Sequence, residues 1–335
     1  MKLNRVAAAA LAACVVAPVF AQNRPAPAPQ RPAQAASART GQEMSEADRA
    51  TAALYNVKEA LALQVTLDKA GFSPGEIDGR LGKNTLRALE AYEGAKRQKA
   101  VPAANGGLRD YTITKEDAAG PFTRVPADMM DKAKLKALNY ASLLEMLGER
   151  FHIKPELLRQ INPGKRFAAG VTIKVPDVEE TRVPDPRPQG QSTGATFAGN
   201  VTVTVSKSRS SLQVLDNRGL VVFRAPVTTG SERDPLPIGV WQVTAVSRNP
   251  TYNYNPKLFW DADPAHAKAR VAPGPNNPVG VVWIDLSKEH YGIHGTPEPG
   301  KISYSESHGC VRLTNWDALK VASLVGKGTT VRFID

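Results

Sequence analysis

Two short stretches carry most of the information in this sequence: Tyr291-Gly292-Ile293-His294-Gly295-Thr296 and Ser307-His308-Gly309-Cys310-Val311-Arg312-Leu313. A free cysteine thiol has a pKa of about 8.5, so only a few per cent of it is thiolate at neutral pH. A nearby imidazole can accept the thiol proton, or hold the thiolate as an ion pair, and later return a proton to a leaving amine. The two stretches together therefore indicate a nucleophilic cysteine with a histidine as its base.

Cys14 and Cys310 are the two cysteines of the sequence. If a leader containing Cys14 is removed, Cys310 has no partner within the chain. An unpaired cysteine in an exported protein indicates either intermolecular pairing or a reactive thiol, and a small buried apolar side chain is the alternative. The other histidines, His152, His266 and His290, have no such setting and are interpreted as ordinary surface or core residues.

Spacing alone leaves open which histidine acts as the base. His308 stands two residues before Cys310, so on a strand the two side chains would share a face. His294 would have to come from a neighbouring element, and because no Asp or Asn lies beside it in sequence, a backbone carbonyl is expected to orient its ring. Gly309, like Gly295, allows close substrate approach and frees backbone N–H groups for a developing oxyanion.

The sequence around these stretches predicts a β domain over residues 198–335. Valines alternate in 201–205, and Asp216-Asn217-Arg218-Gly219 predicts a hairpin turn. One helix is predicted near the end, capped by Thr314 with Asp317 three residues later. The pattern is typical of a mainly antiparallel fold, either a sandwich or an open barrel. Further strands are predicted at 212–214, 220–223, 239–247, 279–286 and 330–334.

The pairing of YGIHGT with SHGCVRL resembles the signature of the L,D-transpeptidase catalytic domain, often called YkuD-like. The likeness spans nearly all of 198–335 and includes PGPNNPVG at 273–280. It implies that Cys310 is the nucleophile, that His294 is the base and that the Gly295 carbonyl steadies the ring. The residues it implies on the oxyanion and substrate-binding side are Ser307, His308, Gly309 and Arg312.

The resemblance also implies a reaction. Cys310 would attack the meso-diaminopimelyl carbonyl of a peptidoglycan stem tetrapeptide and expel D-alanine. The thioester would then pass to an amine, either on a second stem peptide, which gives a 3-3 cross-link, or on a lysine of an envelope lipoprotein. With water as the acceptor the enzyme would be an L,D-carboxypeptidase. No cofactor is expected.

The N-terminal sequence predicts export. Residues 1–21 combine a positively charged start with an apolar run and end in Val19-Phe20-Ala21, which suits a signal-peptidase site. We expect a cleaved signal peptide and a periplasmic or cell-envelope location, with lipidation of Cys14 as the alternative. The apolar run is too short to span a membrane, so no span is expected in the mature chain. Residues 22–47, rich in Pro, Ala and Gln, predict a semi-extended tether.

A small helical module is predicted at 48–97. Gly71 is expected to end its first helix, and Asn84 or Thr85 to cap its second. The string AGFSPGEIDGRLG at 70–82 resembles the loop of a small peptidoglycan-binding module, and a plain helical hairpin is the alternative. The first helix carries one apolar stripe at helical spacing, formed by Leu54, Val57, Leu61 and Val65.

A second module, of α+β type, is predicted at 108–178. Its order of strand, two helices and strand resembles a glycan-binding LysM module, with extra sequence between the first strand and the first helix. Neither module contains a cysteine, so both are expected to bind rather than to catalyse. A linker rich in Pro and Gly follows at 179–197. The expected elements are a strand at 111–114, helices at 131–152 and 155–161, and a strand at 171–176.

The formal net charge of +11 suits a polyanion of any kind. The sequence has no zinc-finger spacing and no dense Arg/Lys helix that would favour nucleic acid, so peptidoglycan is the expected partner. A thiol redox protein would normally carry a CxxC motif, and a metal site made of His294, His308 and Cys310 lacks further supporting ligands in sequence. The intact IHG and SHGC motifs argue against a wall-binding scaffold with a decayed transferase domain.

Overall fold

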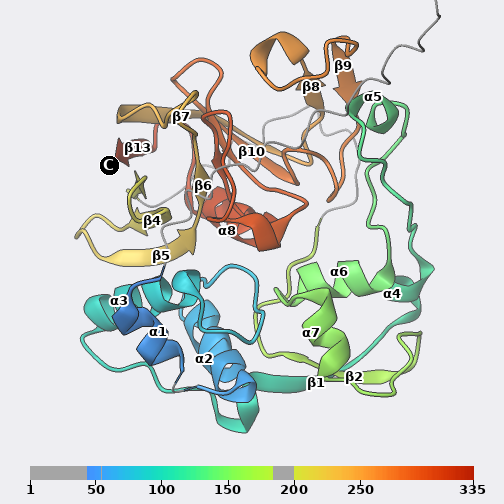
Figure 1. Ribbon diagram of the computed structural model, residues 1–335, viewed down its shortest axis with the longest axis vertical. Helices are drawn as coiled ribbons and strands as arrows, with labels where there is room; N and C mark the ends of the chain where they lie inside the picture. Colours follow the sequence, from blue (N-terminus) through green and yellow to red (C-terminus); the bar gives the residue numbers. More distant parts are fainter. Residues whose placement is uncertain (1–43, 54, 184–199) are drawn as a thin grey trace, which may run out of the picture. The chain divides into compact units, whose positions relative to one another are not determined.

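The computed structural model describes residues 44–53, 55–183 and 200–335 (Figure 1). The signal peptide predicted at 1–21 lies outside the described residues, as do most of the predicted tether and most of the predicted linker. Within the described ranges, each helix is too short or too polar to cross a membrane.

The C-terminal part of the chain builds one sheet that nearly closes on itself. Strands β5 and β6 form its two edges, and only Val227 separates them in sequence. The pairs β3–β13 and β11–β12 are parallel and the other neighbouring pairs are antiparallel. The predicted mainly antiparallel fold is thus confirmed in its open form. In order across the sheet, the strands are β5 (Val221–Pro226), β4 (Ser211–Leu215), β3 (Thr202–Ser206), β13 (Thr330–Ile334), β7 (Gly239–Arg248), β10 (Val282–Leu286), β11 (Gly292–His294), β12 (Val311–Arg312) and β6 (Thr228–Thr229).

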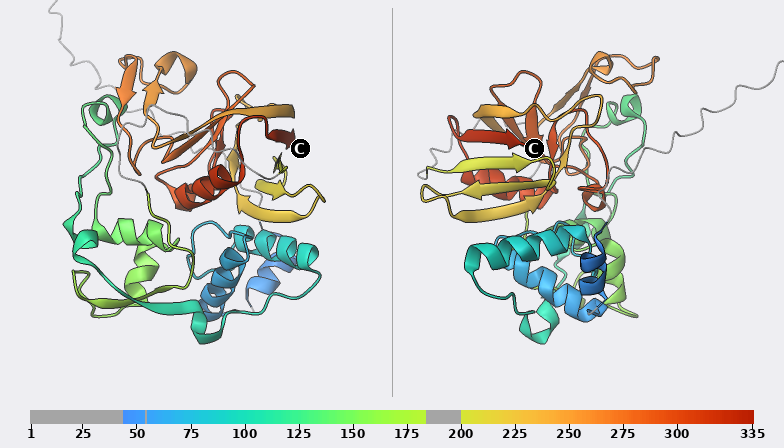
Figure 2. Two further views of the ribbon diagram at one scale, coloured as in Figure 1. Left: turned by 180° about the vertical axis from the view of Figure 1, so that it is seen from behind. Right: turned by 60° about the vertical axis from the view of Figure 1, so that its left-hand side comes forward.

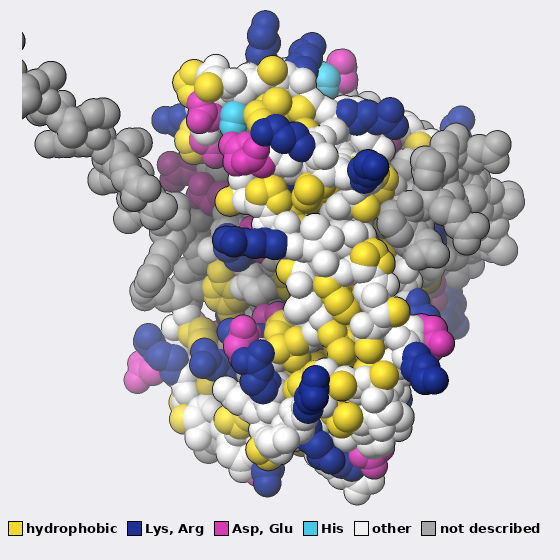
Figure 3. All heavy atoms as spheres, turned by 90° about the vertical axis from the view of Figure 1, so that its right-hand side faces the viewer, with side chains coloured by type: hydrophobic (Ala, Val, Ile, Leu, Met, Phe, Trp, Pro, Cys, Tyr) yellow, Lys and Arg dark blue, Asp and Glu magenta, His cyan; other side chains and the backbone are white. Residues whose placement is uncertain are grey.

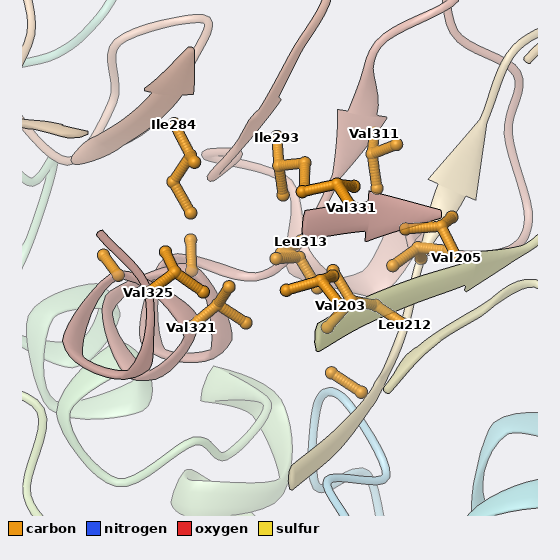
Figure 4. Packing of buried hydrophobic residues seen from close by; sticks show 14 of the residues in the cluster. Val203, Val205, Leu212, Ile284, Ile293, Val311, Leu313, Val321, Val325 and Val331 are labelled. Atoms are coloured by element: carbon orange, nitrogen blue, oxygen red, sulfur yellow. The ribbon is translucent and has the colours of Figure 1, made fainter. Parts of the chain in front are cut away.

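Alternation along the strands separates a buried face of the sheet from an outer one. In β3, Val203 and Val205 are fully buried, whereas the threonines beside them are partly exposed. Figure 4 shows such side chains gathered with Val321 of the last helix and with Val325, which directly follows that helix. Burial of this apolar surface is the main force that holds sheet and helix together.

Helix α8 (Asn315–Leu324) covers this buried face of the sheet (Figures 1 and 2). Its N-cap is Thr314, whose hydroxyl oxygen accepts a hydrogen bond from the Asp317 N–H at 3.1 Å. The predicted cap is therefore confirmed. The cap satisfies one of the N–H groups that a helix leaves unpaired at its start, and it fixes where Asn315 enters the core.

A small two-stranded sheet, β8 (Tyr252–Tyr254) with β9 (Ala269–Val271), follows β7 in sequence. Its buried residues form a separate apolar cluster with Leu138, which comes from far earlier in the chain. This cluster packs against the two strands and Phe259 of the loop between them, and the loop reaches the candidate site through Asp261.

The helix predicted at 131–152 is wrong over its middle part. The structure has α5 (Met129–Lys132) and α6 (Leu143–Arg150), with turns and irregular backbone between them. The Leu138 N–H donates to the Pro273 carbonyl at 2.9 Å. This contact with a distant segment replaces the bond that a helix would make, so tertiary packing overrides the apolar periodicity.

The region predicted as a helical module contains α1 (Glu46–Ala52), α2 (Val57–Lys69) and α3 (Lys83–Lys96). Gly71 follows α2 with a φ of +81°, in the left-handed region that favours glycine, so its predicted role at the helix end is confirmed. At the start of α3, however, the N-cap is Gly82.

The cap predicted for α3 at Asn84 or Thr85 is wrong, because both side chains bond elsewhere. The Asn84 amide donates to the Ile302 carbonyl at 3.2 Å, and the Thr85 hydroxyl accepts from the Gln64 amide at 3.0 Å. These two residues therefore lie inside the first turn, where they serve packing contacts instead of the helix end.

In the second module the strand predicted at 111–114 is found at 108–112, and the helix predicted at 131–152 is divided into α5 and α6, whereas the helix predicted at 155–161 and the strand predicted at 171–176 are confirmed. β1 (Leu108–Thr112) pairs antiparallel with β2 (Thr172–Pro176), and α6 and α7 (Pro155–Gln160) lie between them in sequence. Pro155 occupies the first turn of α7, as expected. Helix α4 (Lys115–Ala119) lies within the extra sequence. The 3-10 helices are η1 (Ala104–Gly107), η2 (Pro256–Leu258) and η3 (Pro299–Lys301).

Backbone hydrogen bonds join the loop after α2 to strand β5. The Ser73 N–H donates to the Arg224 carbonyl, and the Arg224 N–H donates to the Gly71 carbonyl, both at 2.8 Å. The Arg224 side chain is fully buried and donates to the Ser73 carbonyl at 3.0 Å, and burial lowers its pKa to about 9. The helical region is thus packed directly on the sheet.

Candidate active site

Strands β11 and β12 bring the two sequence motifs side by side. They pair in parallel, with Ile293 opposite Val311 and His294 opposite Arg312. Ile293 and Val311 point into the core (Figure 4). Because side chains alternate along a strand, His294 and Arg312 share the other face. Cys310 immediately precedes β12, at the level of the start of β11.

His294 is held by one backbone acceptor and one aromatic ring. Its Nδ1 lies 2.7 Å from the Gly295 carbonyl oxygen. A carbonyl can only accept, so Nδ1 carries the proton in the neutral ring and Nε2 keeps its lone pair. The ring stacks on Trp283 of β10 at a centroid distance of 5.4 Å. Burial, aided by the Arg312 charge, lowers the pKa of His294 to about 3, so the ring is neutral at physiological pH.

Cys310 is half-buried, and its thiol donates a long hydrogen bond of 3.7 Å to the His290 carbonyl. Burial raises the pKa of the Cys310 thiol, and the Gly292 N–H and the Arg312 charge oppose that rise. With the histidine pKa lowered and the thiol pKa raised, the imidazole and the thiol are both uncharged in the resting state. An imidazolium–thiolate ion pair is disfavoured in this state.

Gly309 meets a strict requirement of the turn before Cys310. Its backbone φ of +96° is one that residues other than glycine rarely adopt. A Cβ placed there would also lie 2.6 Å from the ring of Tyr291. The backbone that carries the thiol therefore sits directly against Tyr291, which fixes the position of Cys310 relative to β11.

Ser307 and Arg312 make bonds within the turn itself. The Ser307 hydroxyl donates to the Cys310 carbonyl at 2.6 Å, and its N–H donates to the Gly230 carbonyl at 3.0 Å. The Arg312 guanidinium donates to the Glu306 carbonyl at 3.1 Å. Ser307 therefore shapes the turn, and the charge of Arg312 acts on both the His294 and the Cys310 side chains.

His308 does not share a strand face with Cys310, because the two residues lie in a bend before β12. Its Nε2 lies 2.8 Å from an Asp261 carboxylate oxygen. Its ring packs edge-on against Phe259, at 4.9 Å between centroids, and against Trp260. The structure thus turns His308 toward the β8–β9 loop, while Gly295 follows β11 and holds His294, and Cys310 directly precedes β12.

Sequence reasoning missed two residues of this neighbourhood. Trp283 stacks on His294, and Asn315 packs beside Gly295. Trp283 could have been found from the antiparallel register of β10 and β11, which places it opposite His294. Asn315 gives no such signal, because its contacts come from segments far apart in the sequence. Within the described part of the chain, no three His, Cys, Asp or Glu side chains gather in a way that could hold a metal ion.

Comparison with known proteins gives a consistent match. The model of the YkuD family, described as an L,D-transpeptidase catalytic domain, matches residues 200–333. A Bacillus licheniformis protein described as an L,D-transpeptidase, YkuD, is 30% identical over 191 residues, which cover 56% of this chain and 91% of that protein. Its namesake from Bacillus subtilis is 28% identical over 190 residues, with the same coverage of 56% and 91%.

Solved structures give a weaker likeness. An L,D-transpeptidase from Mycobacterium smegmatis is 16% identical, covers 52% of this chain and 78% of its own, and aligns with a TM-score of 0.34.

Proposed function

This chain belongs to the YkuD family of L,D-transpeptidase catalytic domains, and we propose that Cys310 is the nucleophile with which it transfers peptidoglycan stem peptides. The observation that carries the proposal is the pairing of the two motifs on β11 and β12. A neutral imidazole with its Nδ1 proton bound to the Gly295 carbonyl lies on the same sheet face as Arg312, two residues after the thiol.

The first half of the reaction forms a thioester. Sγ of Cys310 attacks the carbonyl of the third, meso-diaminopimelyl residue of a stem tetrapeptide while Nε2 of His294 accepts the thiol proton. Because the resting pair is uncharged, the proton leaves as the S–C bond forms. Backbone N–H groups at Gly309 and Cys310 bind the oxyanion. The C–N bond to D-alanine then breaks, and His294 returns the proton to the leaving amine.

The second half passes the acyl group to an acceptor. An amine of a second stem peptide would give a 3-3 cross-link, and a lysine of an envelope lipoprotein would become attached to the wall. With water the same thioester would give an L,D-carboxypeptidase. His308 is fixed by Asp261 and would line the acyl pocket, and the Arg312 charge favours the anionic species at the sulfur or a substrate carboxylate.

The decisive test uses the mature full-length chain and a disaccharide-tetrapeptide, with products read by mass spectrometry. The wild-type chain should give a mass adduct on Cys310 and a new product, whereas Cys310→Ser should give neither and should keep the melting temperature. A cross-linked dimer identifies a stem-peptide acceptor and a tripeptide identifies water. Full turnover by Cys310→Ser would exclude Cys310 as the nucleophile.

We further propose that the chain is exported to the cell envelope and that both N-terminal modules bind the wall, one as a peptidoglycan-binding-like module and one as a LysM-like module. The Bacillus relatives align over more residues than 200–333 contains, which supports shared sequence upstream of the catalytic domain. The net charge of +11 suits an acidic wall, and Lys and Arg side chains are spread over the face drawn in Figure 3.

Wall binding is tested with the full mature chain carrying Cys310→Ser, so that no covalent adduct forms. Sedimentation with purified sacculi should remove the protein from solution at low salt and less of it at high salt, because exposed charges are screened. A chain that stays in the supernatant at low salt would contradict the assignment of both modules and favour a protein partner instead.

A further inference from the structure

Asn315 lies where three backbone segments meet behind the candidate base. It is fully buried at the start of α8, and its Oδ1 accepts a hydrogen bond from the Val281 N–H at 3.2 Å. The same oxygen fills the space beside Gly280 and Gly295, so that a Cβ on either glycine would overlap with it. The Asn315 side chain therefore sets how closely α8 approaches the backbone at Gly295.

That backbone carries the acceptor that orients His294. The Gly295 carbonyl is the oxygen at 2.7 Å from Nδ1 of His294. A shift of the Gly295 peptide would weaken this bond and allow the other tautomer, in which Nε2 carries the proton and cannot accept the thiol proton. A displacement of about 1 Å at such a position can lower a rate by about 10²-fold.

The orientation of the Asn315 amide depends in turn on the second module. Its Nδ2 donates to the Pro275 carbonyl at 3.1 Å and to the Glu149 carboxylate of α6 at 2.9 Å. The other Glu149 oxygen accepts from the Tyr140 hydroxyl at 2.8 Å. With two acceptors on Nδ2, a flipped amide would place Oδ1 against two oxygens, so Glu149 helps to fix which way Asn315 points.

We propose that Asn315 and Glu149 are positioning residues for the acyl transfer: Glu149 orients the Asn315 amide, Asn315 seats the Gly295 carbonyl, and this carbonyl holds His294 in the tautomer that can act as a base. The α6 module thereby contributes to the rate of the chemical step and not only to binding. The inference rests on the proposed role of His294.

The same helix offers a matched control. Glu145 accepts from the Asn276 amide of the catalytic domain at 2.6 Å, just as Glu149 accepts from Asn315. Asn276 makes its other side-chain bond to the Asn139 carbonyl, away from the His294 strand. Glu145→Ala therefore removes one polar link between module and domain and leaves Glu149 and the Pro275 carbonyl, the two acceptors of the Asn315 amide, in place.

The test compares Glu149→Ala, Glu149→Gln and Glu145→Ala in the full mature chain. Glu149→Ala should lower kcat for a soluble tetrapeptide substrate by about 10- to 100-fold with KM within about twofold, because positioning acts on the chemical step. Glu149→Gln keeps an acceptor for Asn315 and should restore most of the rate. Glu145→Ala should stay within about twofold of wild type. Equal losses in the two alanine variants would mean that general docking, and not positioning, is responsible.

A second readout does not depend on turnover. In chains labelled with ¹⁵N-histidine, wild type should show His294 as the single Nδ1–H tautomer, and Glu149→Ala should show a mixture of tautomers, whereas Glu145→Ala should match wild type. An unchanged His294 signal in Glu149→Ala would overturn the inference even in an active enzyme. If wild type proves inactive on stem peptides, the proposed function fails while the tautomer measurement remains decisive. Asn315→Ser serves the same purpose if Glu149→Ala does not fold.

Discussion

Two regions of this molecule each bury a histidine against a tryptophan, with opposite consequences for charge. His294 stacks on Trp283 at 5.4 Å between ring centroids, and His152 stacks on Trp316 at 5.0 Å. Their exposed fractions are nearly equal, 4% and 7%. Yet the pKa of His294 is lowered to about 3, whereas the pKa of His152 is raised.

The neighbours of the two rings explain the difference. Burial alone disfavours the charged ring in both cases. At His152 the Asp68 carboxylate lies 3.0 Å from Nδ1, and with the nearby Asp317 it more than offsets that burial. At His294 the Nδ1 partner is an uncharged carbonyl and the nearest charge is that of Arg312. A buried histidine is therefore a neutral base or a cation according to its partners.

The largest expected effect is on the pH dependence of stability. Between about pH 6.5 and 3 the unfolded chain protonates His294 while the native ring stays neutral. The unfolded state then binds more protons, so the free energy of unfolding falls as pH falls, by about 1.4 kcal/mol per pH unit and by about 5 kcal/mol in total. In His294→Gln this contribution disappears. Between pH 7 and pH 4, the free energy of unfolding measured in urea should fall by about 3 kcal/mol less in His294→Gln than in wild type.

His152 should behave in the opposite way and serves as the control. Its native pKa is raised, so its stabilising contribution is complete below the unfolded pKa of about 6.5 and is lost as pH rises through the native pKa. His152→Gln should therefore flatten the stability curve above pH 6.5 and not at pH 4. Parallel curves for both variants and wild type would contradict the assigned charge states.

The next effect is on rate. His294→Ala should slow thioester formation by about 10²-fold or more, the usual scale for loss of a positioned base. His152→Gln should leave that rate within about threefold, provided that the chain is folded under the assay conditions. Single-turnover mass spectrometry of the Cys310 adduct measures both. Comparable losses of rate in the two variants would mean that the rate of thioester formation depends on a buried histidine beside a tryptophan in general, and not on the position of His294 near Cys310.

The two histidines also show what the sequence could and could not predict. The site around His294 is built by two adjacent strands close together in sequence. Spacing alone left open whether His294 or His308 pairs with Cys310, and the prediction of His294 came from the resemblance of the two motifs to the L,D-transpeptidase signature. The bonds of His152 go to Asp68 and Thr181, 84 and 29 residues away. The hydrophobic periodicity of a sequence does not predict contacts between residues so far apart. For the same reason the sequence misplaced the helix at 131–152, whose middle bonds to a distant segment.

A single glycine limits what strand periodicity can predict about His308. Two residues apart on a regular strand, His308 and Cys310 would share a face. The φ of +96° at Gly309 breaks that alternation and turns the His308 ring toward Asp261. A glycine between two candidate residues is thus a reason not to apply strand periodicity across it.

The smallest expected effect concerns this glycine, and it tests whether the catalytic region depends on close backbone packing as the His152 region depends on charge. Gly309 and Gly328 have similar φ values of +96° and +89°, but a Cβ at Gly328 would meet nothing within 4 Å. Gly328→Ala should cost about 1 kcal/mol of unfolding free energy from backbone strain alone. Gly309→Ala carries the same strain and in addition must displace the partly exposed ring of Tyr291, so it should cost about 1 kcal/mol more. Because Cys310 follows directly, it should also slow thioester formation, whereas Gly328→Ala should not. Equal stability losses with an unchanged rate in both variants would show that the contact with Tyr291 does not position the thiol.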